Sequence, residues 1–436
     1  MRLDTIAAPI TGSQKAAVAI VRVSGPEAWT VVSKVFHPWP DPVSPRTALY
    51  GQFRHGEDGL AIPFAEGASF TGEQSVELNI HGSPASIRLL LADLYSEGVR
   101  PAEPGEFSLR AFLHGRIDLT QAESIRDTVE AQTATQLRIA QRIQSGELRA
   151  RLGEIEDRWM KVLAAVEAAA DFSEEIGDFD GEAALGILRP TLTDLDQLLQ
   201  TANAGRILRE GFRVAIQGRP NAGKSTLLNT LVGFERAIVT AIPGTTRDTL
   251  EETFEVGGVP IRLVDTAGLR ETEDVVERLG IDRSTRESES ADLILYLVDC
   301  SEGVTAEDSA HIDSLGDRGL VVFTKIDAAD TQAPAGSLAI SCHTGQGLAE
   351  LLEVLEDRVQ RADVSQIAPV QARHVSYLQA CAASVQQAID TIEHRLPDDL
   401  ISTCLRDALY QLGLVTGKTA SADMIDRIFA DFCIGK

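Results

Sequence analysis

The segment "GRPNAGKS" at residues 218–225 has the residue types and spacing that hold a nucleotide's phosphate chain. It follows the apolar run "FRVAIQG" and precedes "TLLNTLVG", which has the pattern of a helix. Gly218 and Gly223 allow backbone N–H groups to wrap the phosphates. Lys224 carries a positive charge for the β- and γ-phosphates, and Ser225 offers a hydroxyl to Mg²⁺. Strand, loop and helix in this order predict nucleotide binding.

Two short segments further along the chain supply the rest of a magnesium nucleotide site. "PGTTRD" (243–248) offers Thr246, a hydroxyl that completes the Mg²⁺ shell and senses the γ-phosphate. "DTAG" (265–268) ends a strand, which puts Asp265 on the metal side and the Gly268 N–H near the γ-phosphate. Either string alone is an ordinary loop, but their order after the phosphate loop indicates one site.

The segment "TKID" (324–327) predicts that the base is guanine. Asp327 can accept hydrogen bonds from the guanine N1–H and exocyclic amine, which adenine does not offer. The Lys325 stem can cover the base face. The usual motif is Asn-Lys-x-Asp, and Thr324 offers only a hydroxyl where the Asn amide would reach both the base and the phosphate loop. We therefore expect guanine specificity with weaker affinity.

The next strand-like run ends in "SCHTG" (341–345), which we expect to complete the base pocket with backbone N–H groups. The residues concerned are Ser341, Cys342 and His343.

The catalytic residue is less obvious from the sequence. In "VDTAGLRETEDVVERLG" (264–280), Leu269 occupies the position where many GTPases keep a catalytic Gln. A Leu side chain has no polar atom that could orient a water molecule. Another group must assist hydrolysis if the chain turns the nucleotide over.

The elements that position these residues predict a multidomain fold. Residues 1–117 mix strands at 16–25 and 74–84 with a helix at 86–98, which indicates an α+β N-terminal domain. Residues 118–209 and 366–436 have helical patterns and form an α-helical bundle domain, and one helical run follows Pro190 and ends near Arg209. Between them, apolar strands alternate with helices over 210–365, which predicts an inserted α/β Ras-like P-loop G domain with a mostly parallel sheet.

Composition limits the setting in which such a protein works. The chain has 436 residues and a net charge of −25, which argues against it wrapping nucleic acid without a local basic patch or a more basic partner. Solubility alone would also account for this charge. Its 5 cysteines form no C-x-x-C pair, so a disulfide framework or zinc site is not expected and a reducing cytoplasm is the default. The sequence contains no apolar run of about 20 residues and no signal-peptide pattern, so we expect no membrane association.

Several longer strings together resemble the MnmE (TrmE) family of tRNA modification GTPases. In the nucleotide region they are "GRPNAGKST", "VTAIPGTTRD" and "DTAGLRETEDVVERLGI", and at the C-terminus "DFCIGK". In the N-terminal region they are "AIVRVSG", "SFTGEQSVELNIHG" and "PGEFSLRAFLHGRIDLTQAESI". The resemblance covers essentially the whole chain.

The resemblance implies a catalytic arrangement that needs no Gln. In the family a potassium ion supplies the charge of an arginine finger, and a glutamate assists the water. Glu277 matches that glutamate, although alone it would be read as a solvated charge. A cation bridging phosphate oxygens stabilises charge during transfer. The implied K⁺ ligands are Asn221, Thr240, Ile242 and Thr245.

The nucleotide contacts implied by motif and resemblance together form a larger set. Ser225 and Thr246 are the expected Mg²⁺ ligands. The expected GTP-binding residues are Asn221, Ala222, Gly223, Lys224, Ser225, Thr226, Thr240, Ala241, Ile242, Pro243, Gly244, Thr245, Thr246, Asp265, Thr266, Ala267, Gly268, Thr324, Lys325, Asp327, Ser341, Cys342 and His343.

The resemblance also implies that the N-terminal domain forms a constitutive dimer and binds 5-formyl-tetrahydrofolate or a related folate. The matching positions are Arg22, Glu77 and Arg116, where Arg116 replaces the Lys expected there, and Lys436 is a further candidate. Glu77 could pair with pterin N–H groups and the arginines with carboxylates or ring oxygens, but each alone is an ordinary surface charge. Cys433 is a possible functional thiol near the folate, whereas a lone Cys is more often inert.

The implied reaction is modification at carbon 5 of the wobble uridine of certain tRNAs, giving (carboxymethyl)aminomethyluridine. It uses a folate one-carbon unit and the FAD-containing partner MnmG, and GTP hydrolysis drives G-domain dimerisation. One alternative is a ribosome-assembly or signalling GTPase switch, which leaves the N-terminal strings and "CIGK" unexplained. Another is a dimerising adaptor that binds GTP without turnover.

Overall fold

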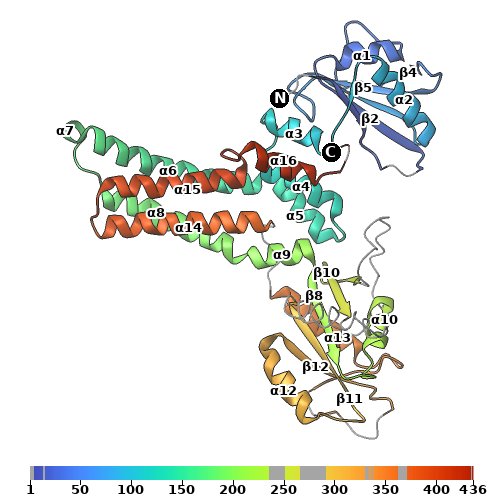
Figure 1. Ribbon diagram of the computed structural model, residues 1–436, viewed down its shortest axis with the longest axis vertical. Helices are drawn as coiled ribbons and strands as arrows, with labels where there is room; N and C mark the ends of the chain where they lie inside the picture. The colour runs from blue at the N-terminus through green and yellow to red at the C-terminus, as the bar shows by residue number, and fades with distance from the viewer. Residues whose placement is uncertain are drawn as a thin grey trace, which may run out of the picture. The chain divides into compact units, whose positions relative to one another are not determined.

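The structure of the protein is a computed structural model. It describes residues 4–12, 15–234, 251–265, 291–328, 333–334, 337–361, 371–433 and 435, without the side chains of 173, 176, 234, 251, 252, 264 and 265. The chain forms two compact units (Figure 1). One contains residues 1–126, 143–188 and 383–436, and the other contains residues 127–142 and 189–382.

The first unit begins with a mixed sheet whose described strands follow the order β3-β4-β5-β6-β2-β1-β7. Neighbouring strands are antiparallel, except that β1 and β7 are parallel. The strands are β1 (Ile6–Pro9), β2 (Val18–Ser24), β3 (Phe36–His37), β4 (Leu49–Phe53), β5 (Asp58–Phe64), β6 (Ser75–His81) and β7 (Arg100–Pro101).

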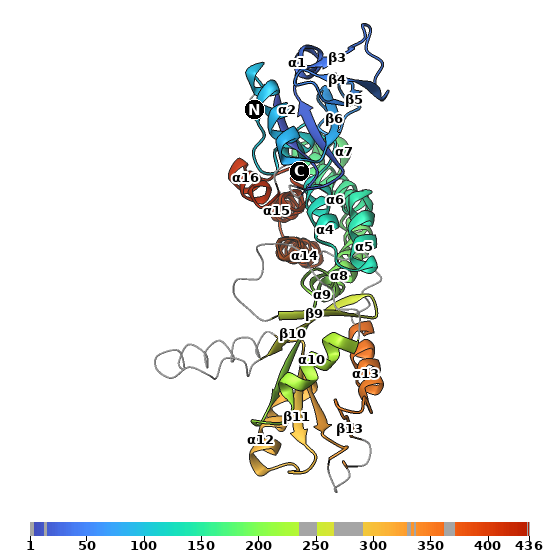
Figure 2. The same ribbon diagram turned by 90° about the vertical axis from the view of Figure 1, so that its right-hand side faces the viewer.

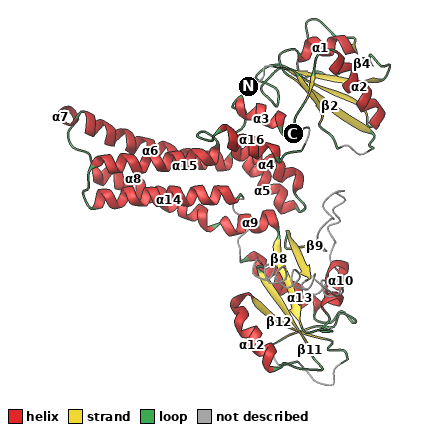
Figure 3. Ribbon diagram, viewed as in Figure 1, coloured by secondary structure: helices red, strands yellow, loops and turns green. Residues whose placement is uncertain are grey.

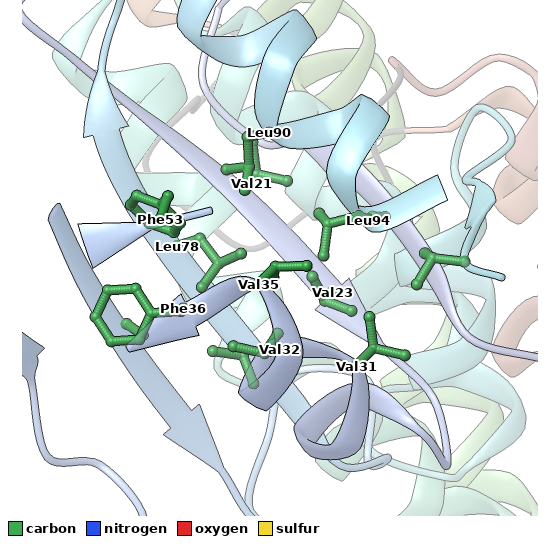
Figure 4. Close-up of a cluster of buried hydrophobic side chains, with 14 of the residues drawn as sticks. Val21, Val23, Val31, Val32, Val35, Phe36, Phe53, Leu78, Leu90 and Leu94 are labelled. Carbon is green, nitrogen blue, oxygen red and sulfur yellow. The ribbon is translucent and has the colours of Figure 1, made fainter. Parts of the chain in front are cut away.

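Two helices, α1 (Ala28–Val35) and α2 (Pro84–Ser96), cover one face of this sheet. Alternate residues of the strands point into the core between them, as Val21 and Leu78 do in Figure 4. Val76, Leu78 and Ile80 are buried on β6, so the alternation in residues 74–84 correctly predicted a half-buried strand. The other sheet face carries the intervening residues.

The helical part follows the N-terminal sheet and returns at the C-terminus. Its long helices α6 and α15 lie side by side (Figures 1 and 3). The helices are α3 (Glu106–Leu113), α4 (Leu119–Glu130), α5 (Ala134–Gln144), α6 (Glu147–Asp171), α7 (Ser173–Ile176), α8 (Gly181–Gln200), α9 (Ala202–Glu210), α14 (Ala372–Glu393), α15 (Asp398–Thr416) and α16 (Ala422–Ala430).

The predicted start of one helix was wrong. The sequence suggested a helical run that follows Pro190, but α8 begins at Gly181 and contains Pro190 in its interior. Leu185, Leu188 and Leu195 are buried at helical spacing on both sides of the proline. Burial of this apolar stripe therefore continues the helix despite the N–H that proline lacks.

The second unit contains a sheet whose described strands follow the order β13-β12-β11-β8-β10-β9. All neighbours are parallel except β9 and β10, as the alternating apolar strands predicted. The strands are β8 (Phe212–Gly218), β9 (Glu251–Val256), β10 (Val259–Asp265), β11 (Leu293–Asp299), β12 (Gly319–Thr324) and β13 (Leu338–Ala339).

Helices cover both faces of this sheet. Helix α12 (Ala306–Leu315) lies on one face, and α10 (Lys224–Phe234) and α13 (Leu348–Gln360) lie on the other (Figures 1 and 2). The central strand β11 is buried along its whole length. Because β8, β11 and β12 are parallel, their carboxyl ends lie at the same edge of the sheet. In a doubly wound sheet, the ligand site lies at this edge. No described helix combines the length and apolar content needed to cross a membrane.

Candidate nucleotide-binding site

The loop between β8 and α10 is shaped for close backbone approach. Gly218 has φ of 140°, and a Cβ there would lie 2.4 Å from the carbonyl oxygen of Leu297 on the neighbouring strand. Only glycine fits this position. The Lys224 ammonium, at the start of α10, donates to the carbonyls of Gly218 at 2.9 Å and Arg219 at 2.6 Å. The loop and its lysine therefore form one hydrogen-bonded unit.

The remaining loop residues present polar groups at the surface. Asn221 is exposed with φ of 64°, and Gly223 has φ of 92°. Asn tolerates this left-handed region better than most residues, so the backbone accepts a side-chain amide here. Ser225 and Thr226 are exposed in the first turn of α10. Both hydroxyls lie at a helix N-terminus, where anions and their metal ions are bound.

Thr324 connects the base-reading segment with the phosphate loop. It ends β12 and is 2% exposed. Its hydroxyl lies 2.8 Å from the carbonyl oxygen of Ala222 and 3.3 Å from that of Val298. The hydroxyl thus keeps the contact with the phosphate loop that was expected of an Asn amide at this position.

Lys325 follows at a left-handed φ of 58°, and its ammonium lies 2.8 Å from Asp299 Oδ2. Burial would raise the pKa of Asp299, but hydrogen bonds from Lys325 and Ser301 outweigh it and lower the pKa. The carboxylate therefore stays charged and holds the lysine stem in place. The sequence reading missed Asp299, although an Asp that ends a buried strand could have been singled out.

Asp327 keeps the ionised form that guanine recognition needs. A hydrogen bond from the Ser341 side chain lowers the pKa of the Asp327 carboxyl. Ser341 is itself buried and its Oγ accepts from the Thr344 N–H at 3.1 Å. Burial raises the pKa of the nearby Cys342 thiol, and His343 is exposed. The structure brings together Asp327 and the "SCHTG" loop, as expected.

A polar cluster on the other side of the phosphate loop was not anticipated. The Arg219 guanidinium contacts Glu302 at 3.1 Å and Asp308 at 3.3 Å. The Tyr296 hydroxyl donates to the buried Asp308 at 2.6 Å, and burial together with this carboxylate raises the pKa of Tyr296 to about 12. Asp308 also completes the capping box of α12 with Thr305. The cluster fixes Arg219, whose carbonyl holds Lys224.

Part of the predicted site lies outside the described residues. This part contains the expected catalytic residue and most switch residues, namely Thr240, Ala241, Ile242, Pro243, Gly244, Thr245, Thr246, Thr266, Ala267, Gly268 and Glu277, with Lys436. Asp265 is described only as the last residue of β10.

Two of the folate candidates face each other in the N-terminal sheet. Arg22 on β2 and Glu77 on β6 are paired in the strand register, and their side chains form an ion pair at 2.8 Å. The Arg22 guanidinium also lies over the Phe70 ring at 4.8 Å and the Phe107 ring at 5.4 Å. The two aromatic rings and the carboxylate fix the position of the Arg22 guanidinium. The guanidinium can still present N–H groups to a ligand.

The other N-terminal candidates lie at the end of the same domain. Arg116 is exposed, and its Cγ lies close to Gly72. Cys433 is exposed, and its carbonyl accepts from the Gly105 N–H at 3.4 Å. Gly435 fits against Pro9, where a Cβ would lie 2.1 Å from the carbonyl oxygen. The C-terminal segment therefore reaches the N-terminal domain, as its expected role near the folate requires.

The parallel sheet, the phosphate loop after β8 and the base-reading residues after β12 define a P-loop nucleotide-binding protein of the Ras-like class. Two family models match successive parts of the chain. The model described as "GTP-binding protein TrmE N-terminus" matches residues 5–116, and that described as "MnmE helical domain" matches residues 119–433.

Curated relatives match this chain from end to end. The tRNA modification GTPase MnmE of Moorella thermoacetica is 41% identical over 461 residues, covering 99% of both chains. That of Heliobacterium modesticaldum is 39% identical over 463 residues, again with 99% of both covered. That of Carboxydothermus hydrogenoformans is 37% identical over 461 residues and covers 100% of both. The chain belongs to the MnmE family of tRNA modification GTPases.

Proposed function

We propose that this GTPase, with MnmG, modifies carbon 5 of the wobble uridine of certain tRNAs using a folate one-carbon unit. The observation that carries the proposal is the end-to-end match to relatives named tRNA modification GTPase MnmE, and the hydrogen bond from Thr324 to Ala222 supports the nucleotide site within it. The family match over residues 5–116 accounts for the N-terminal segment, which a general signalling switch leaves unexplained.

The nucleotide chemistry would be assisted by a potassium ion. Asn221 supports this part of the proposal, because its exposed amide stands at the turn of the phosphate loop on a backbone of φ 64°. An amide oxygen is a hard ligand that suits K⁺. Ser225 would hold Mg²⁺ together with Thr246, and Glu277 would assist the water in place of the Gln that Leu269 replaces. Bound K⁺ would supply positive charge to the phosphate oxygens as transfer proceeds.

The test compares GTP hydrolysis in KCl and NaCl at equal ionic strength. We expect about tenfold or greater stimulation by K⁺, since removal of one charge-stabilising group costs about 10²–10³ in rate. Asn221→Gly should abolish the difference, because glycine removes the amide and accepts the left-handed backbone. Asn221→Ala is less clean, since alanine at positive φ adds about 1–2 kcal/mol of strain. Equal rates in both salts for the natural sequence would reject the potassium step.

Folate binding and dimerisation are proposed for the N-terminal domain. The sheet face opposite the α1–α2 core carries the Arg22–Glu77 pair together with exposed apolar side chains. On that face Val18 is 54% exposed, Tyr50 69% and Leu60 37%. A partly exposed sheet face of mixed apolar and charged residues suits contact with a second copy and a ligand that has both ring and carboxylate groups.

The proposed organisation keeps the boundaries expected from the sequence. Residues 1–117 would bind folate and dimerise, residues 118–209 and 366–436 would form the helical domain, and residues 210–365 would form the G domain. The proposed location is the cytoplasm. With a net charge of −25, the chain would rely on MnmG for much of the tRNA contact. Tight tRNA binding by this chain alone in moderate salt would contradict that division of labour.

A further inference from the structure

The hydroxyl of Thr324 is committed to the main chain. Its two neighbours within hydrogen-bond distance, the carbonyl oxygens of Ala222 at 2.8 Å and Val298 at 3.3 Å, are both acceptors. A threonine hydroxyl has a single proton to donate. The shorter contact takes that proton, so the hydroxyl serves the phosphate loop.

The surroundings of Thr324 hold this arrangement in place. The residue is 2% exposed, pairs with Asp299 in the β11–β12 register, and accepts a hydrogen bond at its own carbonyl from the Cys300 N–H at 3.0 Å. Turning the hydroxyl away would leave the Ala222 carbonyl without this donor. A buried group that loses its partner costs more than an average hydrogen bond gains.

Guanine has two edges that differ in their hydrogen-bonding groups. The N1–H and the exocyclic amine are donors, which match the Asp327 carboxylate, whereas N7 and O6 are acceptors. An Asn amide at position 324 would have two N–H groups, one for the phosphate loop and one for N7. The threonine oxygen has only accepting capacity left, which does not match N7.

Resting on the proposed GTP binding, we propose that Thr324 positions the phosphate loop and leaves guanine N7 unread. The chain recognises the base through the donor edge at Asp327. Replacing N7 by carbon therefore leaves affinity unchanged, whereas replacing N1–H or the amine does not. A protein with the Asn-Lys-x-Asp motif would instead bind N7 through its Asn amide and lose affinity when N7 is replaced.

The experiment measures dissociation constants of the full chain for GDP and 7-deaza-GDP with Mg²⁺, by isothermal titration calorimetry at fixed salt. Diphosphates avoid turnover, so the readout is binding alone. For the natural sequence we expect the two constants to agree within about twofold. In Thr324→Asn the gained N7 contact should favour GDP over 7-deaza-GDP by about two- to tenfold, as for one net hydrogen bond.

Two further variants test the positioning role. Thr324→Val removes the donor to Ala222 and should weaken both nucleotides by the same factor, whereas Thr324→Ser keeps the donor and should restore both. Thermal unfolding of each variant shows that it is folded. An N7 preference of about fivefold or more in the natural sequence would overturn the proposal, and its loss in Thr324→Val would show that Thr324 is the residue that reads N7. Failure of the natural chain to bind GDP at all would instead reject the proposed nucleotide function.

Discussion

At the scale of single residues, three carboxylates of the N-terminal domain surround the buried Arg110. This residue is 3% exposed, and its guanidinium contacts Glu73 at 3.0 Å, Asp4 at 2.8 Å and Glu106 at 2.9 Å. Hydrogen bonds from Arg100 and then Arg110, opposed by burial, lower the pKa of Asp4 to about 2. Burial would raise the pKa of Glu106, but hydrogen bonds that include Arg100 and Arg110 outweigh it and lower the pKa.

Replacing Arg110 by Met should destabilise this domain by about 3–5 kcal/mol, because it leaves the buried Glu73 carboxylate without its arginine partner, whereas Asp4 and Glu106 keep Arg100. The matched control is Arg406→Met. Arg406 forms an ion pair with Glu167 at 2.7 Å, but the two side chains are 65% and 40% exposed, so its loss should cost about 0–1 kcal/mol. Hydrogen exchange of the β1 and β2 amides measures the free energy of local unfolding. Equal costs for the two variants would show that the Arg110 cluster does not stabilise the domain.

The same cluster predicts a pH dependence. The folded-state pKa of Asp4 is depressed from 3.8 to about 2, so its stabilisation is fully present above about pH 4 and is lost as pH falls towards 2. Glu106 contributes in the same direction. The free energy of unfolding of the natural chain should therefore fall between pH 4 and pH 2, and Arg110→Met should show a shallower fall. If the free energies of unfolding of the two proteins fell in parallel with pH, the carboxylates responsible would lie outside the Arg110 cluster.

Residue-scale prediction from the sequence succeeded where chemistry is local and failed where partners are distant. The phosphate loop and "TKID" were recognisable because each function is written in a few consecutive residues. Arg110 and Asp4 are 106 positions apart, and Tyr296 meets Asp308 across a strand and a helix. Nothing in the spacing of such residues indicates that the fold will join them.

At the scale of elements, apolar periodicity predicted strands better than it predicted helix starts. β8 was predicted at the residues where it occurs, since a short apolar run bounded by glycines has one reading. A helical run was predicted to follow Pro190, and proline is favoured in the first turn of a helix. Its fixed φ also fits a helix interior, and the buried leucines on both sides continue α8. A local preference was overridden by tertiary burial.

The start of α3 offers a sharp test of element packing. Gly105 has φ of 70°, and a Cβ there would lie 2.3 Å from the carbonyl oxygen of Phe429. Gly115 has φ of 67° with nothing within 4 Å of the added carbon, so it is a control with the same backbone and open space. Gly115→Ala should cost about 1–2 kcal/mol from backbone strain alone. Gly105→Ala should cost distinctly more, because α16 must also move.

Urea unfolding measures the free energy of unfolding of the two glycine variants. Hydrogen exchange of the α16 amides, measured separately without urea, then distinguishes them. In Gly105→Ala the amides of α16 should exchange faster under native conditions, whereas in Gly115→Ala they should keep the protection of the natural chain. Equal protection in both variants would mean that the Gly105–Phe429 contact is relieved by a small local shift.

At the scale of the whole chain, the C-terminal segment packs against the end of the N-terminal segment. Phe429 and Phe432 are buried with Leu119 and pack against the partly buried Phe112, and the rings of Phe112 and Phe429 are 6.1 Å apart. Gly435 lies against Pro9 as well. The sequence placed a boundary after residue 117 because the helical pattern begins there, but periodicity carries no information about contacts between chain ends. Residues that come last in the sequence therefore cover α3, where the N-terminal segment ends.

A fragment of residues 1–117 should consequently be incomplete. It lacks Phe429, Phe432 and Leu119, and burial of one Phe contributes about 1.5–3 kcal/mol. We expect the fragment to melt several degrees lower when alone than when mixed with a peptide of residues 417–436, since a ligand that binds only the folded state raises Tm. The peptide with Phe429→Ala and Phe432→Ala is the matched control and should have no effect.

The same mixture of fragment and peptide tests whether the C-terminal segment contributes to folate binding. If the C-terminal segment completes the proposed site, 5-formyl-tetrahydrofolate should bind the fragment more tightly with the natural peptide than without it. The control peptide should leave folate affinity unchanged, because it cannot fill the apolar contact around Phe112 that seats α16. Folate binding of full strength by the fragment alone would show that Arg22 and Glu77 suffice, and that the segment around Cys433 has another role. Fluorescence titration of each mixture decides between these outcomes, and the natural and control peptides differ only at Phe429 and Phe432.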